Sequence, residues 1–504
     1  MSASMTRTKT SEGGHSCPPN GGLEKPTSVG DVAQTELGRM PADWRVGRFD
    51  SLFDVQQGRQ VSKKNRIGDN HRPFLRTKNV FWNRLDLSDL DEMHFSEADE
   101  SRLALKPDDL LICEGGDIGR TAIWRGVISR CYYQNHLHRA RIRASEAADA
   151  QFVLFWLWYA FEFGNLYFGR GNVTTIPNLS QSKLCELPLA IPPLAEQQKI
   201  AGVLGLVQRA IEQQERLIAL TAELKKGLLH KLFTEGLRGE PQKQTEIGPV
   251  PESWEVVQLG ECCDIVSGSL SYTDFIKMGS SDAVDALACM GVKVSDMNLP
   301  GNESRFVTSN LTKRLSVDVA RRKLVPPNTV VFPKRGAAIA TNKKRLTTTW
   351  TVLDPNLIGL SAKDSLDEEF LFHWSQTFDL RKITDPGPTP QLNKKDLVPI
   401  LIPLPKDIDE QQEIAAAISC VDNKMTCHQR THATLTDLFR TLLHQLMTAQ
   451  IRVHDLDLDE ILQRSVAESG DATVNPPIVG NGRDRSLRGN RAHNRPVQDR
   501  GNES

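Results

Sequence analysis

The sequence predicts two tandem domains of mixed α+β or α/β class, separated and closed by two long helices that form an antiparallel coiled coil with pseudo-twofold symmetry. Three observations predict this architecture. Segments of the first half return in the same order in the second half, two long stretches without proline each carry one apolar stripe, and short apolar runs lie between Gly, Pro and Asn turns elsewhere. A chain of 504 residues is also too long for one ordinary domain.

Four pairs of similar segments identify a tandem duplication. The second member of each pair lies roughly 210 to 220 residues after the first. The pairs are 35–44 with 245–254, 105–112 with 324–331, 176–180 with 389–393, and 191–198 with 402–412. Because four matches in one order are hard to obtain by chance, we expect each half to contain the same kind of domain followed by a long helix.

Each copy begins with a domain in which short β-like runs alternate with turns. The expected strands include 109–113, 329–332 and 398–402, and the expected apolar helices are 151–163 and 368–377. The resulting organisation is an N-terminal tail (1–34), a first domain (35–193), a central helix (194–240), a second domain (241–407), a distal helix (408–450) and a C-terminal tail (451–504). Both tails have few large apolar side chains to offset the entropy of ordering, so we expect them to be mostly disordered.

The two long helices carry apolar residues at alternating steps of four and three, which is the pattern of a coiled-coil seam. Neither helix can bury this stripe alone, so we expect the two helices to pack on each other. A helix of about 40 residues is roughly 60 Å long. The first helix therefore delivers the chain to the second domain and the second helix returns, which makes the pair antiparallel.

Polar residues interrupt both seams. The interruptions are Gln214 and Thr221 in the first helix and His428 and His432 in the second. In an antiparallel pair these positions fall near the middle. There they either face each other as a buried polar layer that fixes the register, or lean toward solvent or another subunit, and the sequence leaves both alternatives open.

Composition excludes several classes of protein. The 62 Lys and Arg residues balance 63 Asp and Glu residues, so a nucleic-acid surface can arise only from local sorting of charge. The longest apolar run, 152–163, is too short for a membrane helix and contains Glu162, so no membrane partner is expected. Nine cysteines without a C-x-x-C pair, and an N-terminus without a signal-peptide core, favour a reducing cytoplasm.

Three motifs are the most specific features of the chain. They are I-P-P-L-A-E-Q-Q-K-I at 191–200, L-K-K-G-L-L at 224–229, and T-E-[LI]-G-x-[MV]-P-x-x-W at the start of both domains. Together they make residues 35–450, approximately, resemble the specificity subunit of type I restriction–modification enzymes. The resemblance implies that each globular domain is a target-recognition domain that reads half of a split site in double-stranded DNA. It also implies that the helices act as a ruler and dock two methyltransferase subunits, and that a restriction subunit, a translocating nuclease, completes the complex.

The second copy departs from these motifs at two places. The connection into the second helix, 402–410, is longer than its counterpart. Residues 438–441 are Leu-Phe-Arg-Thr where 224–227 are Leu-Lys-Lys-Gly. Whether both helices dock a methyltransferase equally well is therefore open.

Catalytic motifs are missing from the sequence, which fits a subunit that reads DNA without chemistry of its own. The near match to an adenine methyltransferase motif, N-P-P-I at 475–478, lacks the aromatic residue, and there is no phosphate-binding loop. Glu114 follows P-D at 107–108 but lacks the lysine of a nuclease metal site, so we interpret it as the edge of a core strand. We expect this chain to bind no cofactor or metal, with S-adenosylmethionine, ATP and Mg²⁺ on the partner subunits, as the resemblance implies.

DNA reading needs cations that contact phosphates and side chains that make hydrogen bonds to base edges. Such residues gather on expected loops of both domains. In the first domain the candidates are Arg59, Lys63, Lys64, Arg76, Lys78, Asn79, Arg120, Gln134, Asn135, Arg170, Asn172 and Thr174. In the second domain they are Lys293, Lys334, Arg335, Lys343, Lys344, Arg345 and Gln391.

Some of these segments have a structural alternative. We interpret 115–120 and its counterpart 334–337 mainly as tight turns after a strand, with direct DNA contact by their arginines as the alternative. Gln134 and Asn135 are equally well explained by a turn in which their amides cap backbone groups. The basic run 321–323 is interpreted as a phosphate patch.

The two domains differ most inside these loops, whereas their frameworks match, so we expect an asymmetric, bipartite target. The helix length places the centres of the half-sites on the order of one to one and a half DNA turns apart. The alternative of another class is a non-catalytic coiled-coil scaffold whose paired α/β domains bind protein or glycan. Such a scaffold would need acidic or aromatic loops where Arg and Lys predominate, so the DNA-binding subunit is favoured.

Overall fold

The structure is a computed structural model that describes residues 32–144, 148–167, 178–384 and 390–455. It divides into two compact units: unit 1 contains residues 1–206 and 441–504, and unit 2 contains residues 207–440. Most of both expected tails lies outside the described residues. Among the described residues, no helix is long and apolar enough to span a membrane.

The domain of unit 1 is built around a four-stranded antiparallel sheet with the order β10-β9-β12-β4. A three-stranded sheet, β11-β5-β8, lies beside it, with β11 parallel to β5 and β8 antiparallel to it. Two-stranded ladders pair β1 with β2, β3 with β13, and β6 with β7. The strands are β1 Val32–Thr35, β2 Gly38–Pro41, β3 Arg45–Arg48, β4 Phe53–Gln57, β5 His71–Leu75, β6 Val80–Phe81, β7 Arg84–Leu85, β8 Asp91–His94, β9 Leu110–Cys113, β10 Thr121–Ile123, β11 Tyr132–Tyr133, β12 Leu137–Ile142 and β13 Pro188–Ile191, and the helices are α1 Glu97–Leu103, α2 Ala150–Glu162 and α3 Gln181–Cys185.

The domain of unit 2 repeats this succession of elements. Its main sheet has the order β17-β24-β21-β22-β19, in which the first four strands correspond to β4, β12, β9 and β10. Its three-stranded sheet, β20-β18-β23, again contains one parallel pair, between β18 and β23. The strands are β14 Gln242–Thr245, β15 Gly248–Pro251, β16 Glu255–Gln258, β17 Cys263–Ser267, β18 Leu287–Val292, β19 Arg305–Phe306, β20 Thr312–Leu315, β21 Val330–Pro333, β22 Arg345–Thr347, β23 Trp350–Leu353, β24 Leu357–Ala362 and β25 Leu401–Leu404, and the helices are α5 Leu259–Cys262, α6 Tyr272–Lys277, α7 Val317–Lys323, α8 Glu368–Ser375 and α9 Lys394–Leu397.

The T-E-[LI]-G motif at the start of each domain forms the turn of a β-hairpin. Thr35 donates its hydroxyl hydrogen to the carbonyl oxygen of Gly38, and Thr245 does the same to Gly248. Both glycines have left-handed backbone angles, with φ of 97° and 105°, which residues with a Cβ rarely adopt. The tryptophan that ends the motif is fully buried in both domains. The repeated motif therefore specifies a turn and an anchor in the core.

The E-Q-Q motif ties the start of each long helix to the domain before it. The side-chain oxygen of Gln197 accepts a hydrogen bond from the backbone N–H of Asp149 at 2.7 Å, and Gln411 accepts one from Asp367 at 2.8 Å. Each glutamine also donates to a proline carbonyl oxygen at 2.9 Å. Asp149 and Asp367 cap the apolar helices α2 and α8. The motif therefore fixes the angle between the long helix and the domain core.

The turn before the central strand is also shared by the two domains. Asp108 and Asn328, just before β9 and β21, have φ of 68° and 62°. Asp and Asn tolerate this left-handed conformation better than other residues with a Cβ. The segments 105–112 and 324–331 thus share a turn, with Asp108 matched to Asn328, one residue out of step with the pairing made from the sequence.

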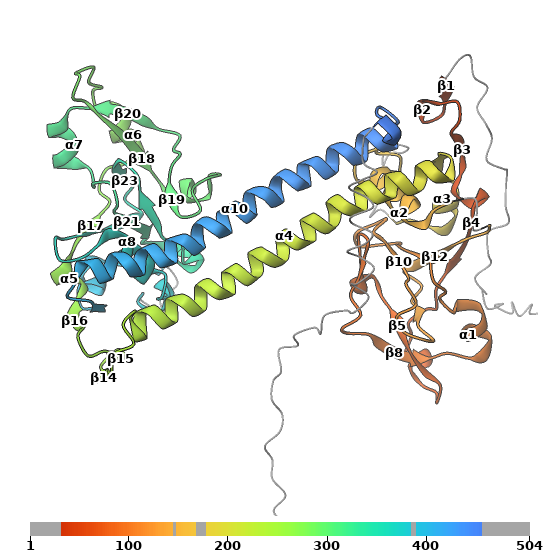
Figure 1. Ribbon diagram of the computed structural model, residues 1–504, viewed down its shortest axis with the longest axis horizontal. Coiled ribbons are helices and arrows are strands. Elements are labelled where there is room, and N and C mark those ends of the chain that lie inside the picture. The colour runs from red at the N-terminus through yellow and green to blue at the C-terminus, as the bar shows by residue number, and fades with distance from the viewer. Residues whose placement is uncertain (1–31, 145–147, 168–177, 385–389, 456–504) are drawn as a thin grey trace, which may run out of the picture. The chain divides into compact units, whose positions relative to one another are not determined.

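The long helices are α4, Leu194–Glu235, and α10, Ile408–Met447. Within unit 2 they lie side by side and antiparallel, as Figure 1 shows. Lys225 donates to Asp422 at 2.8 Å, and farther along, Gln214 pairs with His428 at 2.9 Å. The residue numbers fall along one helix as they rise along the other, which confirms the antiparallel pairing.

The polar interruptions of the two seams meet only in part. Gln214 contacts His428 across the pair, as one of the two alternatives requires. His432 reaches Glu215 at 3.4 Å and is partly exposed. Thr221 donates instead to the carbonyl oxygen of Leu217 in its own helix. Among the four interruptions, only Gln214 and His428 therefore contact each other, and they do not form a complete polar layer.

Candidate nucleic-acid interface

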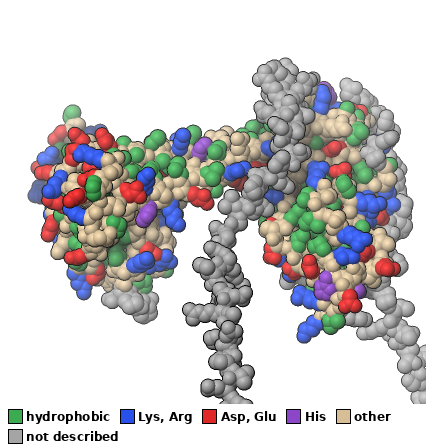
Figure 2. All heavy atoms as spheres, turned by 60° about the horizontal axis from the view of Figure 1, so that its bottom comes forward, with side chains coloured by type: hydrophobic (Ala, Val, Ile, Leu, Met, Phe, Trp, Pro, Cys, Tyr) green, Lys and Arg blue, Asp and Glu red, His purple; other side chains and the backbone are tan. Residues whose placement is uncertain are grey.

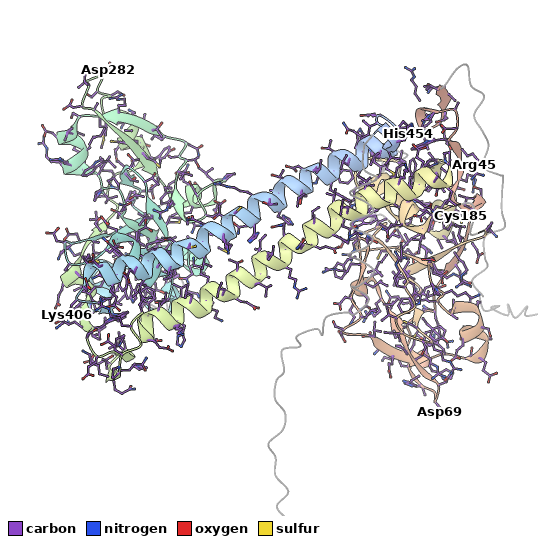
Figure 3. The ribbon with its side chains drawn as sticks, in the orientation of Figure 1. Arg45, Asp69, Cys185, Asp282, Lys406 and His454 are labelled. Carbon is purple, nitrogen blue, oxygen red and sulfur yellow. The ribbon has the colours of Figure 1, made fainter. Side chains whose placement is uncertain are left out.

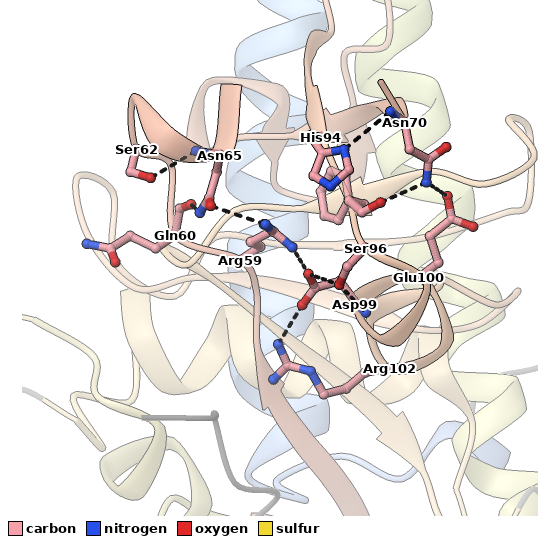
Figure 4. A network of polar contacts seen from close by, with 11 residues as sticks. Arg59, Gln60, Ser62, Asn65, Asn70, His94, Ser96, Asp99, Glu100 and Arg102 are labelled. Atoms are coloured by element: carbon pink, nitrogen blue, oxygen red, sulfur yellow. Dashed lines mark hydrogen bonds and ion pairs between the residues drawn. The ribbon is translucent and has the colours of Figure 1, made fainter. Parts of the chain in front are cut away.

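The loop after β4 is held to helix α1 by a polar network (Figure 4). Arg59 forms an ion pair with Asp99, donates to Asn65 at 3.1 Å, and lies over the ring of Phe95 at 5.5 Å. At the end of the loop, Asn70 donates to Glu100 at 2.7 Å. Arg59, a candidate DNA contact, thus has a structural partner for its charge, and its side chain is only 16% exposed.

The network leaves the basic tip of the same loop at the surface. Lys63 and Arg66 are exposed, whereas the side chain of Lys64 is not described. Asp69, on this loop, is labelled at the lower end of unit 1 in Figure 3. Lys63 and Arg66 are therefore cations on a loop of fixed position, which suits contact with phosphates.

The segment 76–79 has its charges neutralised by acidic residues. Arg76 pairs with Asp91 at 2.7 Å, and Lys78 pairs with Asp89 at 2.7 Å and with Asp91 at 3.3 Å. The hydrogen bond from Arg76, followed by that from Lys78, holds the pKa of Asp91 below its usual value. Asn79 is buried, and its amide donates to two backbone carbonyl oxygens at 3.0 Å. These contacts give Asn79 a role in shaping the loop.

An aromatic and cationic cluster surrounds the β6–β7 hairpin. The guanidinium groups of Arg84 and Arg120 lie over the ring of Phe81 at 4.9 and 5.1 Å. Trp82 stacks on Trp158 of α2, with ring centroids 5.1 Å apart and planes within 5°. Sequence reasoning identified Arg120 but missed the aromatic residues, although the F-W-N-R run at 81–84 is visible in the sequence.

Gln134 and Asn135 form a turn before β12. Gln134 is buried, its backbone forms an isolated bridge with Arg59, and the N–H of Asn135 donates to the carbonyl oxygen of Arg59. The turn of the structural alternative is therefore present, and the contacts that form it are backbone hydrogen bonds. The remaining candidates of the first domain, Arg170, Asn172 and Thr174, lie outside the described residues.

In the second domain, several of the candidate DNA-binding residues make contacts within the domain itself. Lys293 lies over the ring of Tyr272 at 4.9 Å, and Lys343 donates to Asn298. Lys344 is buried and donates to the carbonyl oxygen of Phe378 at 2.6 Å. Burial lowers the pKa of Lys344 to about 8. Lys344 is therefore a poor candidate for a DNA contact.

Arg345 also donates to nearby backbone. Its guanidinium donates to the carbonyl oxygens of Lys344 at 2.9 Å and Met297 at 3.3 Å. Burial lowers its pKa from the usual value for arginine. These contacts hold strand β22 to the loop that precedes β19.

Arg335 and Gln391 come together in the folded domain. Their backbones form an antiparallel bridge, although they are far apart in sequence. Arg335 is exposed, and Gln391 donates to Asn393 at 3.0 Å. The structure thus brings the turn after β21 and the T-P-Q-L-N segment to one edge of the domain, as an interface that contacts a single ligand requires.

The residue directly after the central strand is a buried charge in both domains, with opposite sign. Glu114 follows β9 and Lys334 follows β21, and each is 8% exposed. Sequence reasoning interpreted Glu114 as the edge of a strand and did not name it as a candidate. The sequence pairing of 105–112 with 324–331 would align Glu114 with Pro333, so the match between Glu114 and Lys334 emerges only from the strands that precede them.

Charge is finely mixed elsewhere on the surface. On the visible face of unit 2, Lys and Arg side chains are interspersed with Asp and Glu (Figure 2). No group of three or more His, Cys, Asp or Glu residues in the described ranges is placed to hold a metal ion. On this face of unit 2, any contact with nucleic acid would therefore depend on individual side chains rather than on one basic patch.

Curated relatives resemble the chain over most of its length. It is 23% identical over 432 residues to a putative type I restriction enzyme MjaX specificity subunit of Methanocaldococcus jannaschii, which covers 83% of this chain and 96% of the relative. It is 22% identical over 435 residues to the type I restriction enzyme MjaVIII specificity subunit of the same organism, covering 83% of this chain and 95% of the relative. A crystal structure of a type-I restriction-modification system S subunit from M. genitalium aligns with a TM-score of 0.49 and 16% identity, covering 79% of this chain and 95% of that chain.

A family model gives the clearest comparison. The model described as the type I restriction modification DNA specificity domain matches residues 41–222 and residues 251–437. Each match contains one domain and part of the long helix that follows it. Because the two matches cover well over half of the sequence and follow its internal duplication, the chain belongs to the type I restriction modification DNA specificity domain family.

Proposed function

We propose that this chain is the DNA-specificity subunit of a type I restriction–modification complex, and that it reads an asymmetric, bipartite site in double-stranded DNA. The observation that carries this proposal is one domain framework used twice, with the same strand order and turns but different side chains at matching edges. A repeated framework supplies two readers, and different side chains at the edges supply two different half-sites.

The differences lie at defined positions. Gln57 at the end of β4 corresponds to Ser267 at the end of β17, because Gln57 pairs with the second residue of β12 and Ser267 with the second residue of β24. Glu114 corresponds to Lys334, which reverses the charge. The two domains therefore present different donors and acceptors from the same backbone positions.

The long helices are proposed to set the spacing of the half-sites and to dock two methyltransferase subunits. Restriction subunits that translocate and cleave DNA would join through them. In this proposal the chain has no catalytic activity, and S-adenosylmethionine, ATP and Mg²⁺ are bound by the partner subunits. The complex would act in the cytoplasm, with the DNA that it reads.

The test is to co-express the full chain with its methyltransferase subunit and to map methylated adenines by single-molecule sequencing. One split motif, methylated only when this chain is present, is the expected result. If a correctly assembled complex produces no new methylation, the proposal fails and the interaction scaffold becomes the better explanation. Omission of the chain, with the methyltransferase alone, is the matched control.

A further inference from the structure

Glu114 and Lys334 occupy the same position in the two domains. The backbone N–H of Glu114 donates to His136 at 3.0 Å, and the N–H of Lys334 donates to Asn356 at 2.9 Å. The carbonyl oxygen of Glu114 accepts from Leu179 at 2.9 Å. That of Lys334 accepts from Leu392 at the same distance. Equivalent hydrogen bonds on both sides mean that only the side chain differs between these positions.

The charge of Glu114 has no cationic partner with a fixed charge. Its Oε2 atom accepts from the amide of Gln57 at 3.1 Å and lies 3.6 Å from Nδ1 of His136, which is charged only when protonated. No Lys or Arg forms an ion pair with Glu114 among the described residues. The carboxylate is 8% exposed, whereas His136 beside it is at the surface.

Lys334 likewise has no oppositely charged partner among the described residues. Its Nζ atom donates only a long hydrogen bond, to the carbonyl oxygen of Gly268 at 3.4 Å, and no carboxylate in the described ranges forms an ion pair with it. Burial, aided by repulsion from Arg335, lowers the pKa of Lys334, with Asp354 opposing. Its neighbour Asn356 is exposed, so this charge also lies just under the surface.

Two buried charges of this kind lower the stability of the folded chain when no ligand is bound. A buried charge without an opposite charge destabilises a domain, and an apolar side chain of similar size serves a core better. The cost is recovered when an external group supplies the missing hydrogen-bond partner. Because Arg335 and Gln391 lie at the same edge as Lys334, the DNA proposed above is the ligand within reach of this position.

We propose that Glu114 and Lys334 are specificity-determining residues at equivalent positions of the two domains. Glu114 accepts a hydrogen bond from the N4 amino group of cytosine in one half-site, and Lys334 donates to O6 and N7 of guanine in the other. In the major groove an acidic side chain matches the cytosine amino donor, and a lysine matches the guanine acceptors. This inference rests on the proposed function and adds the base contacts to it.

The first experiment uses the full chain with its methyltransferase subunits and maps the methylated motif for Glu114→Gln and Lys334→Met. Each variant is expected to relax one G·C position, by roughly tenfold in preference, in a different half-site. Asp108→Asn and Lys363→Met are the matched controls, because each removes a like charge at the other end of the sheet from its test residue. Asp108 precedes β9, the strand that Glu114 follows, and Lys363 follows β24, whose last residues pair beside the start of β21. Asn328 already occupies the position that matches Asp108, so the first control keeps the turn.

The second experiment takes its main result from the wild-type chain, so that misfolding of a variant cannot hide it, and uses the two variants for comparison. It measures binding of the complex to DNA in which 7-deazaguanine replaces guanine, or pyrimidin-2-one replaces cytosine, at each G·C position of the mapped wild-type motif in turn. Loss of guanine N7 is expected to weaken binding by several-fold for wild type and not for Lys334→Met. Loss of the cytosine amino group is expected to weaken binding of the wild-type complex by several-fold as well. The same change should weaken binding of the Glu114→Gln complex less.

The outcomes separate the two proposals. If the wild-type complex methylates a split motif but both variants keep that motif, or both relax the same half-site, this inference is wrong and the proposed function stands. A uniform loss of methylation in the variants, with wild-type binding unaffected by either base analogue, also overturns it. If the wild-type complex methylates no motif, the proposed function itself fails.

Discussion

Arg452, just beyond the end of α10, forms a two-point ion pair with Glu196 near the start of α4. Its Nε atom lies 2.7 Å from Oε1 and its Nη2 atom 2.8 Å from Oε2. Asp43 takes a further contact at 2.8 Å, and the indole N–H of Trp44 donates to Glu196 at 3.2 Å. Glu196 is 7% exposed, so Arg452 supplies the charge that its buried carboxylate needs. The chain after α10 is thereby fixed to the first domain.

Replacement of Arg452 is therefore expected to destabilise unit 1. Arg452→Met leaves Glu196 buried and unpaired, and should lower the free energy of unfolding by about 2–4 kcal/mol. Denaturant titration of the full chain measures this change. Arg125→Met is the control, because Arg125 and Asp108 are both more than half exposed and their pair should contribute about 0–1 kcal/mol. Equal effects of the two substitutions would contradict the assignment.

The Lys225–Asp422 pair is expected to hold the register of the two helices within unit 2. Both side chains are about four-fifths buried, at 20% and 17% exposure. A double-mutant cycle with Lys225→Met and Asp422→Asn should give a coupling energy of about 1–3 kcal/mol. The Lys406–Glu255 pair, 64% and 55% exposed, is the matched control and should give about 0–1 kcal/mol. A negligible coupling for the first pair would mean that the seam alone sets the register.

His373 makes the stability of unit 2 depend on pH. It is buried, and its Nε2 atom lies 2.8 Å from the hydroxyl of Ser419. Burial, with repulsion from Lys225 and Arg305, lowers the pKa of His373 to about 3. Asp422, 3.9 Å away, does not reverse this because it is paired with Lys225.

The unfolded chain therefore binds a proton at His373 near pH 6.5 that the folded chain rejects down to about pH 3. The stabilisation that comes from keeping His373 neutral is fully present in the free energy of unfolding above about pH 6.5, and it is lost progressively as the pH falls toward 3. Denaturant midpoints at pH 7.5 and pH 5 measure it. His373→Gln should show a smaller decrease between these values than wild type. An identical decrease would show that other groups are responsible.

Shortening both long helices by one heptad is expected to change the spacer of the DNA motif and not its half-sites. Deletion of 211–217 from α4 with 425–431 from α10 removes the Gln214–His428 pair and keeps the apolar seam in phase. Seven residues correspond to about 10 Å of helix, or roughly three base pairs. The methylated motif of the co-expressed complex gives the result. Altered half-site bases with an unchanged spacer would disprove the role of the helices as a ruler.

Sequence alone determined the features of this protein that arise from local patterns. The duplication, the two long helices, the apolar seams and the turns of the repeated motifs follow from residue spacing, because burial of an apolar face has a fixed period and a left-handed turn needs Gly, Asn or Asp. The order of domains and helices along the chain also predicted the antiparallel pairing, since the first long helix must carry the chain to the second domain and the second helix must return it. These inferences needed no knowledge of which residues lie close in space.

Only the tertiary structure decided which charged residues are available for a ligand. Arg59 is engaged by Asp99, Lys344 by the carbonyl oxygen of Phe378, and Arg452 by Glu196, which lies 256 positions earlier in the chain. Composition and spacing cannot distinguish a lysine that is buried in its own domain from one that is free at the surface. Glu114 shows the converse, because its likeness to Lys334 lies in shared backbone hydrogen bonds and not in residue type. Pairing of charges depends on contacts between distant segments, and those contacts exist only once the chain has folded.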